Sequence, residues 1–267
     1  MGFIKKACIS DNIAPLIDPV FAAPDTYTAA SLCMATVFYA VQIYCDFSGY
    51  TDMAIAVAAL LGFQLQLNFR FPYFASNIAE FWQRWHISLS IWLRDYLYIP
   101  LGGSRVGSTK TYRNLMITML LGGLWHGAAW NFVIWGGLHG GALAIHRRLR
   151  SRWKKTLPAG TILGPLATFY WVCLTWIFFR CTSLEDALIM LQAFTLFQAP
   201  GTNGLDPSLA LWLIPLGVAH WIAMRRDLPE WTDSLPEGIY AAALGVAVIA
   251  ALLFVPADAR PFIYFQF

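Results

Sequence analysis

Two histidines stand in motifs whose residues suit proton transfer. His126 lies in the segment GGLWHG, within a stretch from Arg113 to Arg147 that contains no other charged side chain. His86 lies in the segment RWHIS. An imidazole with an ordinary pKa of about 6.5 can remove a proton from a hydroxyl group at neutral pH. We therefore interpret His126 as a general base. His86 is expected to position a donor or to provide a second proton path, the alternative being a hydrogen bond without a catalytic role.

Six further side chains are candidates for substrate binding. Asp46 and Asp52 lie in YCDFSGYTDM, between two apolar segments and without a nearby cation in the sequence. This pattern fits the edge of a pocket or a buried network, and its alternative is a polar loop between helices. The remaining candidates are Asn68, Arg94, Asp95 and Trp125. For the polar residues the alternative is a structural hydrogen bond, because polar groups in a membrane must find partners.

The other motifs favour neither a metal nor a bound cofactor. The sequence contains no H-E-x-x-H pair and no G-x-S-x-G nucleophile elbow. Its five cysteines include no C-x-x-C pair, so neither a zinc site nor a disulfide framework is expected. The segment GGSRVGSTK lacks the Gly-Lys-Ser/Thr ending of a phosphate loop. The three histidines left over, His139, His146 and His220, are expected to be structural.

The composition indicates that the elements that position these residues lie in a lipid bilayer. Of the 267 residues, 58% are hydrophobic and only 12% are charged, and the mean hydropathy is +0.55. Soluble domains carry about 25% charged residues, so an ordinary soluble globule is excluded. The net charge of +3 is too small to indicate binding to nucleic acid.

The apolar runs predict an all-α, polytopic transmembrane bundle. A crossing helix needs about 20 mostly apolar residues, and the segment Met53–Leu67 is short enough to be tilted, re-entrant or broken. Pro15, Pro19 and Pro24 predict a loop or an interfacial stretch near the N-terminus, 201–207 predicts a connector, and the aromatic tail 261–267 suits an interface. The predicted spans are Tyr27–Tyr44, Met53–Leu67, Leu115–Ile145, Thr161–Phe179, Leu209–Met224 and Ile239–Val255.

A basic segment indicates the orientation of the bundle. HRRLRSRWKK, residues 146–155, contains six Lys and Arg residues without an acidic one, and short loops of this kind lie in the cytoplasm. A nucleic-acid patch is disfavoured because the segment lies between two apolar spans. If 127–146 is a continuous helix, His126 lies about 30 Å from the basic segment, which is roughly the hydrocarbon thickness. The imidazole is then expected toward the non-cytoplasmic side.

The segment between the early spans and residue 115 predicts an amphipathic helix. Asn77 and Glu80 form a start resembling a capping box, and Glu80 can pair with Arg84. Its apolar stripe consists of Phe81, Trp85, Leu89 and Trp92. Such a helix suits a membrane interface or the wall of a cavity within the bilayer.

Several long segments resemble the membrane-bound O-acyltransferase (MBOAT) family, in particular its bacterial branch that acetylates exported polysaccharides. The resemblance continues more weakly through 175–188 and to the C-terminus, so it covers nearly the whole chain. The segments that carry it are QIYCDFSGYTDMAIA (42–56), LNFRFPYFASNIAEFWQRWHISLSIWLRDYLYIPLGG (67–103) and NLMITMLLGGLWHGAAWNFVIWGGLHG (114–140).

The resemblance implies an acyltransferase in which His126 is essential and His86 is associated with function. It also implies a tunnel or funnel that brings a cytoplasmic donor, acetyl-CoA or a related acyl thioester, toward an acceptor on the far side. The implied acceptor is an exported polysaccharide or an acyl-accepting partner protein, with accessory acetylation subunits as further partners. The implied location is the bacterial inner membrane, with several crossings.

Members of this branch begin with several further helices. The resemblance therefore implies that residues 1–267 form the C-terminal part of a single transmembrane domain whose N-terminal helices are absent from this sequence. Two other functions stay open. One is a transporter or channel without chemistry, against which the lack of a second copy of the His126 region counts. The other is an inactive fragment with a packing role.

Overall fold

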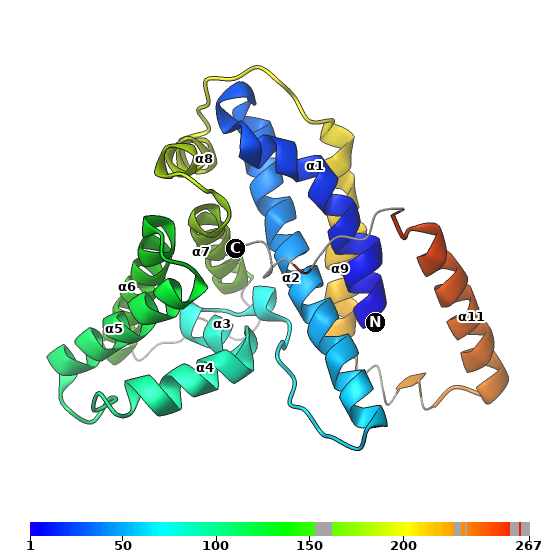
Figure 1. Ribbon diagram of the computed structural model, residues 1–267, viewed down its shortest axis with the longest axis horizontal. Coiled ribbons are helices and arrows are strands. Elements are labelled where there is room, and N and C mark those ends of the chain that lie inside the picture. Colours follow the sequence, from blue (N-terminus) through cyan, green and yellow to red (C-terminus); the bar gives the residue numbers. More distant parts are fainter. Residues whose placement is uncertain (153–161, 227–230, 233, 257–261, 263–267) are drawn as a thin grey trace.

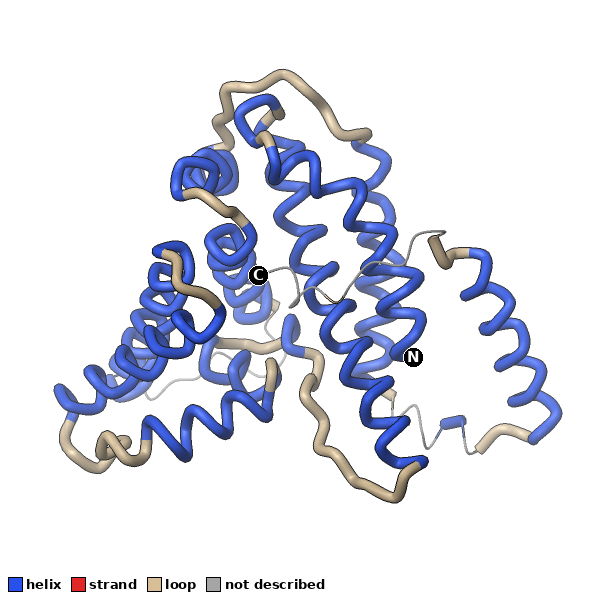
Figure 2. Tube along the Cα trace, viewed as in Figure 1, coloured by secondary structure: helices blue, strands red, loops and turns tan. Residues whose placement is uncertain are grey.

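The computed structural model describes residues 1–152, 162–226, 231–232, 234–256 and 262, and apart from one isolated bridge, Tyr27–Asn203, its regular secondary structure is helical (Figures 1 and 2). This confirms the predicted all-α class. The longer helices are α1 (Asp11–Ala22), α2 (Ala29–Leu60), α5 (Ser108–His126), α6 (Trp130–Arg152), α7 (Leu163–Arg180), α8 (Leu184–Leu196), α9 (Leu213–Arg225) and α11 (Glu237–Leu253). The shorter ones are η1 (Ile4–Ser10), η2 (Pro24–Thr26), η3 (Pro72–Phe74), α3 (Ile78–Arg84), α4 (Ile87–Leu93), η4 (Arg94–Tyr98) and η5 (Pro207–Trp212).

Helix α2 runs without interruption through the segment expected to separate two spans. The prediction of a separate span over Met53–Leu67 was wrong, because α2 ends at Leu60 and a loop follows. The polar residues 44–53 stay helical because η1 packs along them. Lys6 pairs with Asp46 at 2.7 Å, and Lys5 pairs with Asp52 at 2.8 Å. Polar side chains within a helix are tolerated where such partners satisfy them.

The proline-rich N-terminal segment is helical, although prolines had predicted a loop or an interfacial stretch. Pro15 and Pro19 lie inside α1, and an interior proline costs about 3 kcal/mol. The face that carries Ile17, Val20 and Phe21 is buried against α2. Each such side chain contributes about 1.5–3 kcal/mol on burial, so three of them offset the two prolines. Figure 1 shows α1 lying along α2.

The apolar run 115–145 forms a hairpin of two helices, where a single span was expected. Helix α5 ends at His126, and α6 begins at Trp130. The two helices pack closely because glycines face the opposing backbone: a Cβ atom at Gly136 would overlap the carbonyl of Met119. His126 is therefore at the turn of the hairpin, and the basic residues 147–150 are at its opposite end (Figure 1).

The predicted amphipathic helix over 77–101 is broken at Trp85 and His86. Asn77 accepts a hydrogen bond from the Glu80 amide, and Glu80 pairs with Arg84, as predicted. After α3 the chain changes direction, because two backbone groups at the break form hydrogen bonds with the loop that precedes α3. Ile87 N–H donates to the carbonyl of Asn68, and Arg70 N–H donates to that of Arg84. The apolar stripe is thereby divided, with Phe81 and Trp85 in the core and Leu89 and Trp92 beside a pocket.

The described residues contain three helical segments long and apolar enough to cross a membrane: 29–60, 163–180 and 207–225. Helix α7 packs into the core, where Trp176 and Ile177 are buried. Helices α9 and α11 present many large apolar side chains outward. The connector that precedes η5 arches over the molecule in Figure 2, and it includes all of the predicted turn 201–207 except Pro207, which begins η5. Of the aromatic tail 261–267, only Phe262 is among the described residues.

Candidate functional site

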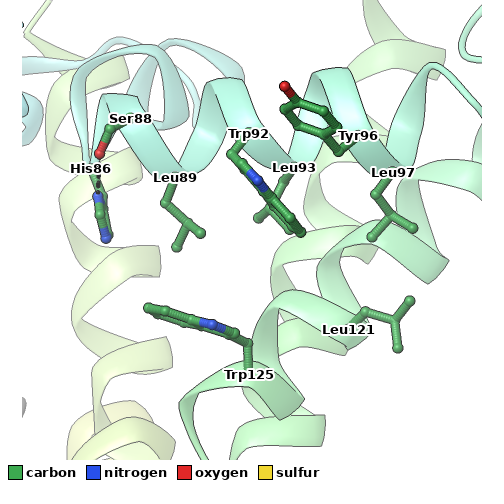
Figure 3. A pocket seen from close by; sticks show the side chains of 9 residues that line it. All are labelled: His86, Ser88, Leu89, Trp92, Leu93, Tyr96, Leu97, Leu121 and Trp125. Carbon is green, nitrogen blue, oxygen red and sulfur yellow. Dashed lines mark hydrogen bonds between the residues drawn. The ribbon is translucent and has the colours of Figure 1, made fainter.

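A pocket of about 630 Å³ lies between the α4–η4 segment and α5 (Figure 3). Its wall is mostly apolar, with one imidazole and one hydroxyl near one end. Ligand sites are characteristically apolar cavities with a few polar groups that orient the ligand. The lining residues are His86, Ser88, Leu89, Trp92, Leu93, Tyr96, Leu97, Leu121 and Trp125.

His86 is presented to the pocket by a turn that Asn68 holds in place. The backbone of His86 is left-handed, with φ of 42°, a conformation that a non-glycine residue adopts only when its surroundings impose it. Asn68 Oδ1 accepts from the Ser88 amide at 3.0 Å and from the Ser88 hydroxyl at 2.9 Å, and it lies 3.3 Å from His86 Nδ1. Phe47 packs perpendicular to the imidazole, with ring centroids 4.7 Å apart. Asn68 thus supports the turn.

His126 stands at the last residue of α5, among aromatic rings. Trp125, Trp135 and Phe179 have ring centroids 5.0, 5.2 and 4.9 Å from that of the imidazole, with interplanar angles of 74°, 86° and 75°. Trp135 and Phe179 are 2% and 1% exposed. The imidazole itself is partly exposed.

The fold brings His86 and His126 together from segments forty residues apart in the sequence. His86 lines the pocket, whereas His126 does not and adjoins it through Trp125. Trp125 connects them structurally, since its indole contacts His126 and also lines the pocket that His86 borders (Figure 3). An apolar pocket of this kind can bind an acyl group, and an imidazole at or next to its wall can move a proton.

Asp46 and Asp52 lie in α2, outside the pocket that His86 lines. Both carboxylates have a lysine partner in η1, although the sequence had suggested that no cation was near. Asp46 shares Lys6 with Asp11, and Asp46 is only 2% exposed. Asp46 therefore lies in a buried network, whereas Asp52 is partly exposed and lines a second pocket, beside Met53 and Leu67. Neither residue lines the pocket with His86.

Arg94 and Asp95 form an ion pair at the surface of η4. Arg94 Nε donates to Asp95 at 2.7 Å, and both side chains are substantially exposed. The hydrogen bonds from Arg94 hold the pKa of the Asp95 carboxyl below its ordinary value. Neither residue lines the pocket, although their neighbour Tyr96 does.

The remaining histidines lie outside the pocket. His139 is fully buried and accepts a hydrogen bond from Trp82 Nε1 at 3.3 Å. His220 packs on the rings of Tyr44, Phe71 and Phe74. These contacts agree with the structural roles expected. Among the described residues, no group of three or more His, Cys, Asp and Glu side chains is arranged to hold a metal ion.

Sequence reasoning missed several residues of the site. Ser88, Trp135 and Phe179 were not singled out, because serines and aromatics are common throughout this chain. Trp92 and Leu89 were placed on the apolar stripe without a functional assignment. All five residues lie near His86 or His126 only because the chain breaks at His86 and turns between α5 and α6, and neither feature is visible in the local sequence pattern.

Comparison with known proteins gives this geometry a context. The model of the membrane-bound O-acyltransferase family matches residues 19–185. That range includes every candidate site residue named above, from Asp46 to His126.

Three bacterial proteins illustrate the similarity. A probable alginate O-acetylase of Azotobacter vinelandii is 49% identical, covering 100% of this chain and 60% of its own length. A peptidoglycan O-acetyltransferase of Helicobacter pylori is 45% identical over 77% of this chain and 38% of its own length. A probable alginate O-acetylase of Pseudomonas aeruginosa is 47% identical over 73% of this chain and 37% of its own. The chain thus spans at most about three fifths of these relatives.

Proposed function

This chain belongs to the membrane-bound O-acyltransferase family, and from that premise we propose that it takes part in moving acetyl groups from a thioester donor to hydroxyl groups of an exported polysaccharide. The observation that carries the proposal is the apolar pocket lined by His86 and Trp125, with His126 packed against Trp125, within the region that the family model matches. The relatives are described as acting on alginate and on peptidoglycan. Both polymers offer sugar hydroxyls as acceptors.

His126 acts as the general base in this proposal. The hydroxyl oxygen forms a bond to the thioester carbonyl carbon, and its proton passes to the imidazole of His126. The carbon–sulfur bond then breaks, and the leaving thiolate takes up the proton from the imidazolium to become a thiol. An ester has formed, a thioester has been consumed, and His126 is neutral again. If an acyl-accepting partner protein is the direct acceptor, its hydroxyl takes the place of the sugar's.

The donor, the partners and the location complete the proposal. The donor is acetyl-CoA or a related acyl thioester from the cytoplasm, and accessory acetylation subunits assist the transfer. The chain crosses the bacterial inner membrane several times, and the basic end of the α5–α6 hairpin faces the cytoplasm. The exposed apolar helices and the cluster of arginines at 147–150 support this orientation.

His126→Gln tests the proposed function. General base catalysis is worth about 10²–10⁴-fold, so the variant should lose acetyl transfer by a factor in that range. The measurement is the release of labelled acetyl groups from acetyl-CoA and their appearance in the polymer, in membranes that contain the chain and its partners. His146→Gln is the control, because His146 lies toward the opposite end of α6.

Undiminished polymer acetylation in His126→Gln would contradict the assignment. Movement of an intact solute across the membrane without consumption of thioester would instead favour a transporter.

A further inference from the structure

The hydrogen-bond partners of His86, the imidazole that lines the pocket, decide which of its two ring nitrogens carries the proton. Burial lowers the pKa of this imidazole to about 4, so at neutral pH the ring is uncharged and has one N–H donor and one acceptor nitrogen. The position of the acceptor determines what the ring can do toward a ligand in the pocket. The proton is assigned to the nitrogen where it completes the hydrogen-bond network.

Asn68 offers an oxygen to this ring, and the orientation of its amide group is fixed. The Ser88 backbone N–H donates to Asn68 Oδ1 at 3.0 Å. Since a backbone N–H can only donate, the atom that receives it must be the side-chain oxygen and not the nitrogen. The Ser88 hydroxyl donates to the same oxygen at 2.9 Å. An amide oxygen has no proton to give, so a further polar atom that binds it must bring its own.

His86 Nδ1 lies next to this oxygen, at 3.3 Å, and 3.4 Å from Ser88 Oγ. With the proton on Nδ1, the ring donates to Asn68 Oδ1, and the hydroxyl of Ser88 keeps its own bond to that oxygen. With a lone pair on Nδ1, two acceptors would face each other. The hydroxyl could then satisfy the ring only by leaving its contact at 2.9 Å for one at 3.4 Å. The first arrangement satisfies more polar groups.

We propose that Asn68 fixes His86 as the Nδ1–H tautomer, so that Nε2 presents a lone pair to the pocket. The hydrogen bonds that the described residues form with this imidazole all involve Nδ1. In Figure 3 the second ring nitrogen points away from Ser88, toward the wall that contains Trp125. Phe47 packs nearly perpendicular to the imidazole, with centroids 4.7 Å apart, and this contact hinders a flip of the ring.

A lone pair at Nε2 determines the role that His86 can have. It accepts a hydrogen bond from an O–H or N–H group of a ligand, and it cannot donate one to the carbonyl oxygen of an acyl group. Both proposed substrates carry such a group, since the acceptor has a hydroxyl and acetyl-CoA has amide N–H groups. Asn68 acts through His86 and is therefore a positioning residue. Only its effect on acetyl transfer rests on the proposed function.

The tautomer can be measured directly by ¹⁵N NMR of the full chain with labelled histidine in detergent. Couplings between the ring nitrogens and the ring protons identify the protonated nitrogen, and His86→Gln assigns the signal among the five histidines. We expect the proton on Nδ1 in the unsubstituted protein and in Asn68→Asp, because a carboxylate also only accepts. In Asn68→Ala the proton should move, in whole or in part, to Nε2.

Two control variants separate this effect from a loss of structure. Asn114 is buried, and its Nδ2 donates to two backbone carbonyls in the turn 101–103. Asn114→Ala removes a comparable turn contact, so it should lower the melting temperature and leave the His86 tautomer unchanged. Ser88→Ala removes the hydroxyl and retains Asn68, so it should also keep the proton on Nδ1.

Acetyl transfer gives a second readout, measured at a temperature where the variants are folded. Asn68→Ala should lower kcat/KM about 10- to 100-fold, the loss typical of a metal-bound histidine deprived of the partner that orients it. Asn68→Asp should restore most of this loss. A rise in KM confined to acetyl-CoA, or to the acceptor, identifies the substrate that donates to Nε2.

The two readouts fail independently. If the tautomer changes in Asn68→Ala but membranes with the unsubstituted chain and its partners transfer no acetyl groups, the proposed function fails and the tautomer assignment stands. A changed tautomer with unchanged kcat/KM would refute a role for Asn68 in transfer. A proton on Nε2 in the unsubstituted protein, or an unchanged tautomer in Asn68→Ala, would overturn the inference itself.

Discussion

On the scale of single side chains, Asn68 is the residue that holds the turn from which His86 reaches the pocket. It is a candidate for substrate binding, with a structural hydrogen bond as the alternative, and its carbonyl and side chain organise the turn at His86. The two histidines could be found from their motifs, since an ionisable ring in an apolar stretch is unusual. The turn could not be found, because it depends on contacts with a residue eighteen positions earlier in the chain. Local patterns predict a continuous helix there.

Asn68→Ala should weaken both the fold and the site. The substitution leaves the Ser88 amide and hydroxyl without their acceptor, which costs about 1–3 kcal/mol for partly buried groups. We expect a lower melting temperature in detergent and a parallel loss of acetyl transfer. Asn68→Asp keeps an oxygen at the same place, so it should recover most of the stability. Equal behaviour of the two variants would show that the Oδ1 contacts contribute little.

On the scale of elements, the α5–α6 hairpin decides where His126 lies. The apolar run predicts one long span, because hydropathy does not distinguish a tight turn at 127–129 from a helix. The glycine spacing did predict close helix packing. Gly136 faces a backbone carbonyl of α5, whereas the nearest atom to a Cβ at Gly137 would be Leu120 Cδ2, at an ordinary 3.8 Å. Of these two neighbouring glycines, Gly136 is therefore the one that the close packing of α5 and α6 requires.

Gly136→Ala and Gly137→Ala should have effects of opposite sign. Overpacking against the α5 backbone costs about 1–3 kcal/mol, so Gly136→Ala should lower the thermal stability in detergent and reduce activity through a shifted His126. Gly137→Ala has room for its methyl group. Replacement of a helical glycine without a clash contributes about 0.5–1 kcal/mol, so this variant should be slightly more stable. Similar melting temperatures for both variants would contradict the packing argument.

On the scale of the whole molecule, the distribution of apolar surface identifies where lipid or further helices must cover the chain. Helix α9 has no buried residue, and its outward side chains include Ile214, Val218 and Trp221. The composition foretold a membrane protein, because 12% charged residues cannot cover a wetted surface. It did not foretell that η1 and α1 would be helical, since the prolines there oppose a helix and only the tertiary contacts favour it.

Cysteine labelling should separate the lipid-facing surface from the cytoplasmic one. Val218→Cys should react poorly with a membrane-impermeant maleimide from either side, because the hydrocarbon core excludes the reagent. Arg150→Cys should react in inside-out vesicles and not in intact cells, as the proposed orientation requires. The unsubstituted protein, with its five cysteines, gives the background. Labelling of Arg150→Cys in intact cells would reverse the orientation.

The unbroken length of α2 has a consequence for the membrane around it. Thirty-two helical residues extend about 48 Å, whereas the hydrocarbon layer is about 30 Å thick. Helices seldom tilt by more than about 40°, and that tilt alone cannot absorb the difference. One end must protrude, and the exposed Leu60 and Leu61 at its C-terminal end would then meet the headgroups. Thick bilayers should therefore suit this protein better than thin ones, through hydrophobic mismatch.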